Sequence, residues 1–262
     1  MKIAVTGKGG VGKTTMSALI AAALQKTGYN VLAIDADPDS NLLACMGHPE
    51  PGSVPPLVEL KELIEERTGV KPGTVGAVFR LNPQVSDIPE KYAVDIGGIK
   101  VLVAGAVKKG GTGCYCPENA FVRTLVAHSL LDKGTALVLD MEAGVEHLSR
   151  GTIRAVDKLL VVIEPGRRSV ETFYRIKTMA DNIGLSQISV IGNRIRSEAD
   201  RKYLEETFPD IHFAGFVPYD ERLREAEIKE VPAPGASESA DNAVMEIIKS
   251  IEIDRNGGKN NG

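Results

Sequence analysis

Short runs of valine, isoleucine, leucine and alanine recur along the chain, separated by segments in which apolar residues return every three or four positions. The apolar runs lack the strict alternation of a sheet with one solvent-facing side. Continuous apolar runs are expected of parallel strands that are covered on both faces. This pattern predicts strands at residues 2–6, 31–35, 100–104, 136–140, 158–163, 188–192 and 212–217.

The intervening segments predict the helices that connect these strands. We expect helices at residues 13–26, 57–67, 117–132, 169–183, 197–207, 220–229 and 236–253. Alternating strands and helices indicate an α/β fold, a doubly wound, mostly parallel sheet with helices on both faces. The region 47–89 is rich in proline and glycine and predicts an excursion around one helix, without a second core. We therefore predict a single domain over residues 1–253 and a flexible tail at 254–262.

Composition places this sequence in the soluble globular class. The chain has 262 residues, of which 43% are hydrophobic and 25% charged, with a net charge of −4. This balance gives no overall attraction to nucleic acid or to an anionic membrane, so we expect neither as a partner. Three cysteines cannot form a disulfide framework, and we see no signal peptide or spanning segment, which predicts a cytoplasmic protein.

The segment GKGGVGKTT follows the first predicted strand directly and precedes a predicted helix. It fits the phosphate-binding pattern G-x-x-x-x-G-K-[ST], in the strand-to-helix context that this motif requires. Its glycines let successive backbone N–H groups face an anion, and the helix adds its positive end. Lys13 should reach the β- and γ-phosphates of ATP, and the Thr14 hydroxyl should ligate Mg²⁺. We expect ATP or ADP to contact the whole loop: Gly7, Lys8, Gly9, Gly10, Val11, Gly12, Lys13, Thr14 and Thr15.

The second lysine of this loop, Lys8, indicates a narrower class of phosphate-binding protein. With it, KGGVGKTT resembles the deviant Walker A motif of the MinD/ParA and nitrogenase iron protein class. The resemblance implies an ATPase that forms a homodimer, in which Lys8 crosses the interface to the nucleotide of the other subunit. It would act there as an arginine finger does when supplied in trans. The alternative is a solvated lysine in a polar loop.

Acidic residues follow two of the predicted strands. In IDADPDSN, Asp35, Asp37 and Asp39 lie at the carboxyl end of a strand, where α/β folds bind ligands. By resemblance to the class, Asp37 lies in the first switch and orients or activates the attacking water near Mg²⁺. The alternative for Asp37 is a turn former. Asp140, at the end of LVLD, matches the Walker B aspartate that holds Mg²⁺ directly or through water, and residues 142–151 would form the second switch.

Two later segments resemble the part of this class that surrounds the nucleotide base. Asn193 closes the strand ISVIGN and is followed by Arg194, a placement that resembles the asparagine that reads the adenine edge. An amide can pair with a donor and an acceptor together. Val217 and Pro218 of VPYD resemble the loop that flanks the base. A turn or cap role for Asn193 remains the alternative.

Cys114 and Cys116 in GGTGCYCPEN precede Pro117, which suits the first turn of a helix. A helix N-terminus favours the thiolate form that binds metal. One chain supplies two sulfur ligands, whereas two chains meeting at this loop would supply the four of a tetrahedral site on a two-fold axis. Cys45 is expected to be an ordinary buried cysteine. The histidines, His48, His128, His147 and His212, lack the spacing of metal ligands.

The cysteine segment and the second switch resemble those of one particular family within this class. GCYCPENA before a helix, together with DMEAGVEHLSRG, resembles the CooC family of nickel-handling ATPases that mature carbon monoxide dehydrogenase. This resemblance covers the chain to about residue 253. It implies ATP-dependent delivery of nickel to an apo-enzyme client, with Ni²⁺ or Zn²⁺ bridging Cys114 and Cys116 of the two subunits.

Two other functions remain open from the sequence. A positioning ATPase of the MinD/ParA type needs a basic amphipathic helix or a basic surface, whereas the last predicted helix is acidic on balance. An electron-transfer ATPase like the nitrogenase iron protein would also place an Fe–S cluster between two cysteines of each chain. In that family the paired cysteines lie far apart in sequence, and thiolate sites do not select their metal by sequence alone. A brown absorption spectrum would indicate the cluster.

Overall fold

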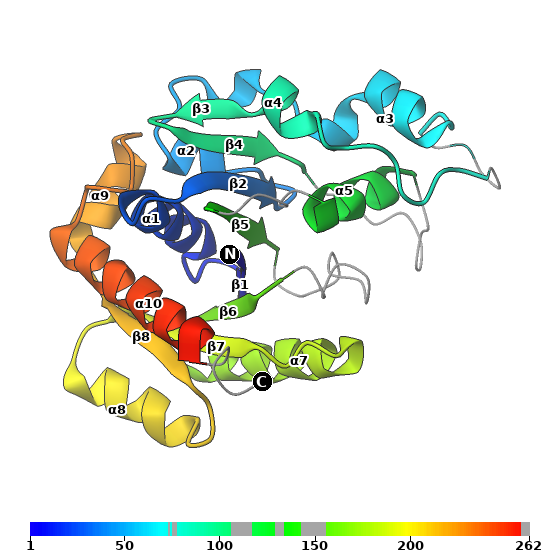
Figure 1. Cartoon of the computed structure of the whole chain (residues 1–262). Coiled ribbons are helices and arrows are strands. Elements are labelled where there is room, and N and C mark those ends of the chain that lie inside the picture. The colour runs from blue at the N-terminus through cyan, green and yellow to red at the C-terminus, as the bar shows by residue number, and fades with distance from the viewer. Residues whose placement is uncertain (73, 75–77, 106–116, 129–133, 143–155, 258–262) are drawn as a thin grey trace.

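The computed structural model describes residues 1–72, 74, 78–105, 117–128, 134–142 and 156–257, and within 254–257 the backbone alone. A central sheet of eight strands runs in the order β3-β4-β2-β5-β1-β6-β7-β8 (Figure 1). All neighbours are parallel except β3 and β4, which are antiparallel. The strands are β1 (Lys2–Gly7), β2 (Asn30–Ala36), β3 (Val94–Ile96), β4 (Ile99–Val103), β5 (Thr135–Met141), β6 (Lys158–Ile163), β7 (Ile188–Ile195) and β8 (Phe213–Pro218).

Every predicted strand is present, and the predicted doubly wound α/β architecture is confirmed. The sequence analysis missed β3, an edge strand of three residues with no fully buried side chain. Such a short strand gives no apolar run to detect. It pairs with β4 through a hairpin at Gly97 and Gly98, where Val94 faces Val101.

Helices connect the strands and cover the sheet. They are α1 (Lys13–Lys26), α2 (Leu42–Cys45), α3 (Lys61–Thr68), α4 (Ile88–Tyr92), α5 (Pro117–His128), α7 (Arg167–Ile183), α8 (Glu198–Thr207), α9 (Glu221–Ile228) and α10 (Glu238–Gly257), with short 3₁₀ turns η1 (Pro51–Ser53) and η2 (Leu57–Glu59). None of the described helices is both long and apolar enough to cross a bilayer.

Two helix predictions need correction. The helix expected at 57–67 is divided, because Leu60 leaves the helical conformation between η2 and α3. The last helix, α10, continues to Gly257, so the first four residues of the predicted tail are helical. Residues 258–262 lie outside the described part of the chain.

Two apolar clusters fill the layers on either side of the sheet. Neighbouring residues of β1 point to opposite faces, so Ile3 and Val5 join one cluster and Ala4 joins the other. Figure 1 shows α1 and α10 side by side on one face, with α5 and α7 on the other. The excursion at 47–89 sends Leu57, Ile64 and Ile88 into the second cluster rather than into a core of its own.

One carboxylate fixes α10 against the end of β8. Asp220 caps α9 by accepting the N–H of Arg222 at 3.0 Å. Its other oxygen accepts the hydroxyls of Ser237 at 2.5 Å and Ser239 at 3.0 Å, at the start of α10. The first turns of α9 and α10 are thus joined at the segment that follows β8.

The close packing of α10 on β8 gives a test of the fold. A methyl group at Gly215 would lie 2.5 Å from the side chain of Ile247, which is far inside contact distance. We expect Gly215→Ala to lower the free energy of unfolding by about 1–3 kcal/mol, measured by urea denaturation. Gly52→Ala is the matched control, because a methyl group there meets nothing. Equal stability of the two variants would contradict this packing.

Candidate functional site

The phosphate-binding loop lies between β1 and α1 and has the conformation that its glycines permit. Gly12 precedes α1 with φ 91°, in the left-handed region, and the N–H of Val11 donates to the carbonyl of Lys8 at 3.3 Å. A methyl group at Gly12 would lie 2.7 Å from Nδ2 of Asn193. That nitrogen donates to the carbonyl oxygen of Val11 at 2.9 Å, so the end of β7 supports the loop from below.

A cavity of about 830 Å³ opens over this loop. Gly9, Gly10, Gly12, Lys13, Thr14 and Thr15 form one wall, while Asp37, Pro38 and Asp39 form another. Lys13 is 8% exposed, and none of the described carboxylates forms an ion pair with it. A buried ammonium without an ion pair requires an anion, which the phosphates of a nucleotide provide.

Asp140 lies at the end of β5 beside the loop and fits a magnesium site. It is 1% exposed, and one of its oxygens accepts the hydroxyl of Ser17 at 3.0 Å. The other oxygen is buried and has no hydrogen-bond partner among the residues that the structure describes. Burial raises the pKa of Asp140 to about 6, although the hydroxyls of Thr14 and Ser17 and the charge of Lys13 oppose the shift. The buried Asp140 oxygen and the Thr14 hydroxyl are together the kind of oxygen ligands that Mg²⁺ takes in phosphate-binding loops.

Asp35 has a different role from its neighbours in the acidic segment. It is fully buried, and its two oxygens accept the N–H groups of Asp37 at 3.1 Å and Leu42 at 2.8 Å. It therefore closes the loop between β2 and α2. Burial raises its pKa to about 7, and Asp140, its partner in the strand register, adds to that shift.

Asp37 lines the cavity, as expected of a residue that could orient water. Its carboxylate also accepts the N–H of Asp39 at 3.0 Å, and its carbonyl accepts the N–H of Ser40 at 3.1 Å. Both interpretations of Asp37 therefore find support: it forms a turn, and it faces the phosphate-binding loop. Asp39 is exposed at the same rim.

Lys8 points away from the loop toward the end of β6. Its ammonium lies 3.2 Å from Oε1 of Glu164, and Oε2 of the same carboxylate lies 3.4 Å from the guanidinium of Arg194. Arg194 has φ 57°, the left-handed conformation, and its side chain reaches Glu164 at the end of the neighbouring strand β6. The sequence analysis did not find Glu164, because its contact with Lys8 spans 156 positions along the chain.

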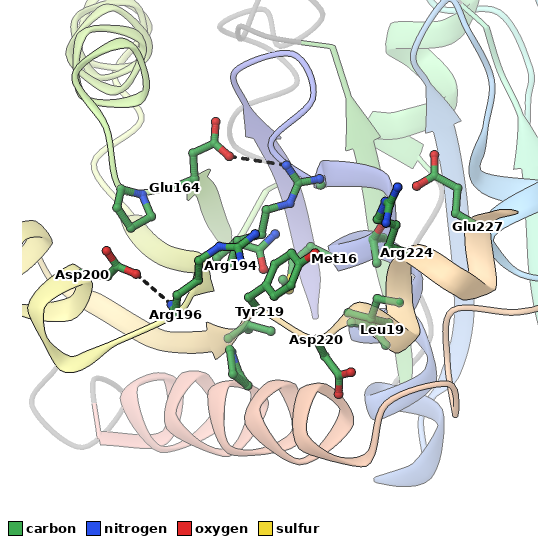
Figure 2. A pocket seen from close by; sticks show the side chains of 17 residues that line it. Met16, Leu19, Glu164, Arg194, Arg196, Asp200, Tyr219, Asp220, Arg224 and Glu227 are labelled. Carbon is green, nitrogen blue, oxygen red and sulfur yellow. Dashed lines mark hydrogen bonds and ion pairs between the residues drawn. The ribbon is translucent and has the colours of Figure 1, made fainter.

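A second cavity, of about 530 Å³, lies beside the first, past Gly12 and Thr15. Figure 2 shows its lining, which includes Met16 and Leu19 from α1 and Tyr219 from the segment after β8. Arg196 stacks on the Tyr219 ring at 3.6 Å from the centroid, and Val217, Pro218 and Asn193 complete the wall. Charged side chains also line this cavity, among them Asp200, Arg224 and Glu227. Apolar surface beside a buried amide and charged groups suits a planar heterocyclic base that carries polar edges.

The cysteines divide between the described and undescribed parts of the chain. Cys114, Cys116 and His147 lie outside the described residues, and so does most of the second switch. Cys45 is half-buried on the wall of the larger cavity rather than fully buried as expected. The protein packed around its sulfur raises the pKa of the thiol to about 12, which keeps it protonated. No metal-binding cluster occurs among the described residues.

Ser17 is a site residue that could have been predicted from its position in the sequence. It stands one helical turn after Lys13, so both side chains belong to the same face of α1 and meet the end of β5. Tyr219 belongs to the segment VPYD that resembles the loop flanking the base, but its stacking with Arg196 gave no such signal, because that contact depends on how β7 and β8 are paired.

Comparison with known proteins agrees with this geometry. The family described as CbiA, the CobQ/CobB/MinD/ParA nucleotide binding domain, matches residues 2–233. The carbon monoxide dehydrogenase accessory protein CooC of Rhodospirillum rubrum is 45% identical over 229 residues, 87% of each chain. The cell division protein MinD of Aquifex aeolicus superimposes with a TM-score of 0.68 over 96% of both chains, at 22% identity. A ParA family ATPase from Chlorobium tepidum superimposes with a TM-score of 0.65, covering 94% of this chain and 96% of its own.

The chain therefore belongs to the CobQ/CobB/MinD/ParA family of P-loop nucleotide-binding domains, and within that family to the CooC-type ATPases.

The buried Asp140 predicts an unusual pH dependence of stability. Its folded-state pKa, about 6, lies above the ordinary aspartate pKa of 3.8, so the folded protein binds this proton more tightly than the unfolded chain. The resulting stabilisation is complete below the unfolded pKa and is lost as the pH rises through about 6. We expect Asp140→Asn to gain up to about 3 kcal/mol relative to wild type between about pH 4 and pH 8. Urea unfolding without nucleotide or magnesium measures this, and a difference that stays constant with pH would contradict it.

Proposed function

We propose that the protein is an ATP-dependent, nucleotide-switched metallochaperone that binds nickel as a homodimer and delivers it to an apo-enzyme such as carbon monoxide dehydrogenase. The observation that carries the proposal is the loop GKGGVGKTT with its buried Lys13 and its outlying Lys8, in a chain 45% identical to CooC. The CooC protein of Rhodospirillum rubrum is an accessory protein of that enzyme, which supports the same class of client here. We expect it to act in the cytoplasm.

The proposed reaction is hydrolysis of ATP to ADP and phosphate. Lys13 and the loop amides would hold the β- and γ-phosphates, and Thr14 and Asp140 would hold Mg²⁺, which neutralises phosphate charge when bound. Asn193, Arg194, Val217 and Pro218 would surround the base. Asp37 would orient the attacking water and accept its proton, because its carboxylate lies on the wall opposite the loop.

The metal is the cargo of this cycle. Cys114 and Cys116 directly precede α5, whose first residue is Pro117 as expected. Two thiolates from each subunit would hold one Ni²⁺ or Zn²⁺ on the two-fold axis of the dimer. If nucleotide closes the dimer, metal affinity and nucleotide affinity are linked and change each other by equal factors.

The two alternative functions, a positioning ATPase and an electron-transfer ATPase, receive less support. The likeness to MinD and ParA structures, at 22% and 14% identity, shows the fold alone. The identity with CooC covers most of both chains and favours an accessory role over electron transfer. An absorption spectrum of anaerobically purified protein still separates an Fe–S cluster from a nickel or zinc site.

The role of Asp37 gives the first functional test. We expect Asp37→Asn to bind ATP normally and to lose hydrolysis by about 10²- to 10⁴-fold, the range that general-base assistance supplies. Asp39→Asn, at the exposed rim of the same loop, is the matched control and should keep activity. Lys13→Ala should lose binding or turnover. Phosphate release and nucleotide titration measure these effects, and normal hydrolysis by Asp37→Asn would remove that residue from the mechanism.

The proposed metal bridge is tested by stoichiometry. We expect one nickel or zinc ion for every two chains, lost when Cys114→Ala and Cys116→Ala are combined, while nucleotide binding survives because the phosphate-binding loop is separate. Cys45→Ala controls for the loss of a thiol and should keep the metal. Elemental analysis of sized protein with and without nucleotide gives the ratio. One metal per chain, or retention by the double variant, would rule out the bridge.

A further inference from the structure

The ion pair between Lys8 and Glu164 raises a question about the resting subunit. Lys8 has its ammonium 3.2 Å from Oε1 of Glu164 in its own chain, with 32% and 26% of the two side chains exposed. In the dimeric ATPase proposed above, the resemblance to the MinD/ParA class implies that the same ammonium contacts phosphates of the partner subunit. Moving the ammonium to the partner's phosphates would draw it away from Glu164, so the two contacts would compete.

The fold builds this contact by fixing both ends. In the parallel pairing of β1 and β6, Gly7 faces Val162, so the residue after β1 and the residue after β6 leave the sheet together. The N–H of Glu164 donates to the hydroxyl of Ser169 at 3.1 Å, and Ser169 is buried at the start of α7. Glu164 is therefore held in place by the sheet and by α7, independently of Lys8.

Breaking the contact does not leave Glu164 without a partner. Its second oxygen lies 3.4 Å from Arg194, so one cation remains when Lys8 departs (Figure 2). A carboxylate that retains a cation is left with a much smaller penalty than an isolated one. The ion pair between Lys8 and Glu164 can therefore break and re-form repeatedly at a small cost in free energy.

We propose that Glu164 is a positioning residue that holds Lys8 within its own subunit and thereby sets the threshold for nucleotide-driven dimerisation. This inference rests on the proposed function, because it requires Lys8 to act across the interface. ATP places more negative charge before the incoming lysine than ADP does, so ATP competes better with the single carboxylate of Glu164. Glu164 therefore keeps subunits apart when the nucleotide is absent or is ADP, and yields when it is ATP.

The expected effect follows from the exposure of the pair. A partly exposed ion pair changes an equilibrium by about twofold to fivefold. Each dimer breaks two such contacts, so Glu164→Gln should lower the dimer dissociation constant by about fourfold to 25-fold. Glu171→Gln is the matched control, since it makes the same charge change in the first turns of α7, where Glu171 pairs with the exposed Arg167.

The test is sedimentation of the full-length chain without nucleotide, with saturating Mg·ADP, and with saturating Mg²⁺ and a non-hydrolysable ATP analogue. Saturation separates dimerisation from any change in nucleotide affinity, which Glu164 could affect from the wall of the base cavity. We expect tighter dimers for Glu164→Gln and unchanged dimers for Glu171→Gln. If Glu164→Gln does not fold, Glu164→Asp replaces it, because the shorter chain draws the carboxylate away from Lys8.

A second arm shows whether the effect passes through Lys8. Lys8→Ala should lose nucleotide-driven dimerisation, and adding Glu164→Gln to it should restore nothing. Equal dimerisation by Glu164→Gln and wild type, or an equal gain from Glu164→Gln in the Lys8→Ala background, would overturn the proposal. If the wild-type protein has the same monomer–dimer balance with and without nucleotide, the proposed function itself is refuted, and this inference with it.

Discussion

The parallel pairing of the central strands is the constraint on which the whole site depends. Asp35 of β2 faces Asp140 of β5, and Asp140 in turn faces Val5 of β1. On the other side, Ile163 of β6 faces Gly192 of β7. Strands that run in one direction all end at one edge, so every loop that carries chemistry emerges there. Shifting one strand by a single residue would turn its carboxylate to the wrong face of the sheet.

The same pairing places like charges close together inside the protein. Burial raises the pKa of both Asp35 and Asp140, and the nearby carboxylate of Asp140 raises that of Asp35 further. The fold offsets part of this cost with local donors, namely backbone N–H groups for Asp35 and the Ser17 hydroxyl for Asp140. Lys13 supplies a nearby positive charge without forming an ion pair to any of the described carboxylates. A nucleotide with its cation would bring charges of both signs to this site, the phosphates to Lys13 and the cation to Asp140.

The sequence was informative where function depends on neighbours along the chain. GKGGVGKTT and its flanking strand and helix predicted the phosphate-binding loop, because every group in that loop comes from one short segment. The same holds for the strands, whose apolar runs record burial on both faces. Glu164 and Arg196 were not predicted, because their contacts with Lys8 and Tyr219 join segments that follow different strands. The division of residues 57–67 into η2 and α3 was missed because apolar spacing does not reveal a single non-helical residue.

The hydrogen bond from Asn193 to Val11 has a consequence for altering this protein. The amide that closes the base cavity also supports the backbone of the phosphate-binding loop, where Val11 immediately precedes Gly12. The preference for a base and the affinity for phosphate therefore both depend on the side chain of Asn193. A redesign that replaces Asn193 to admit a different base would also remove a support of the loop, so the nucleotide specificity of this scaffold is not a module that can be exchanged by itself.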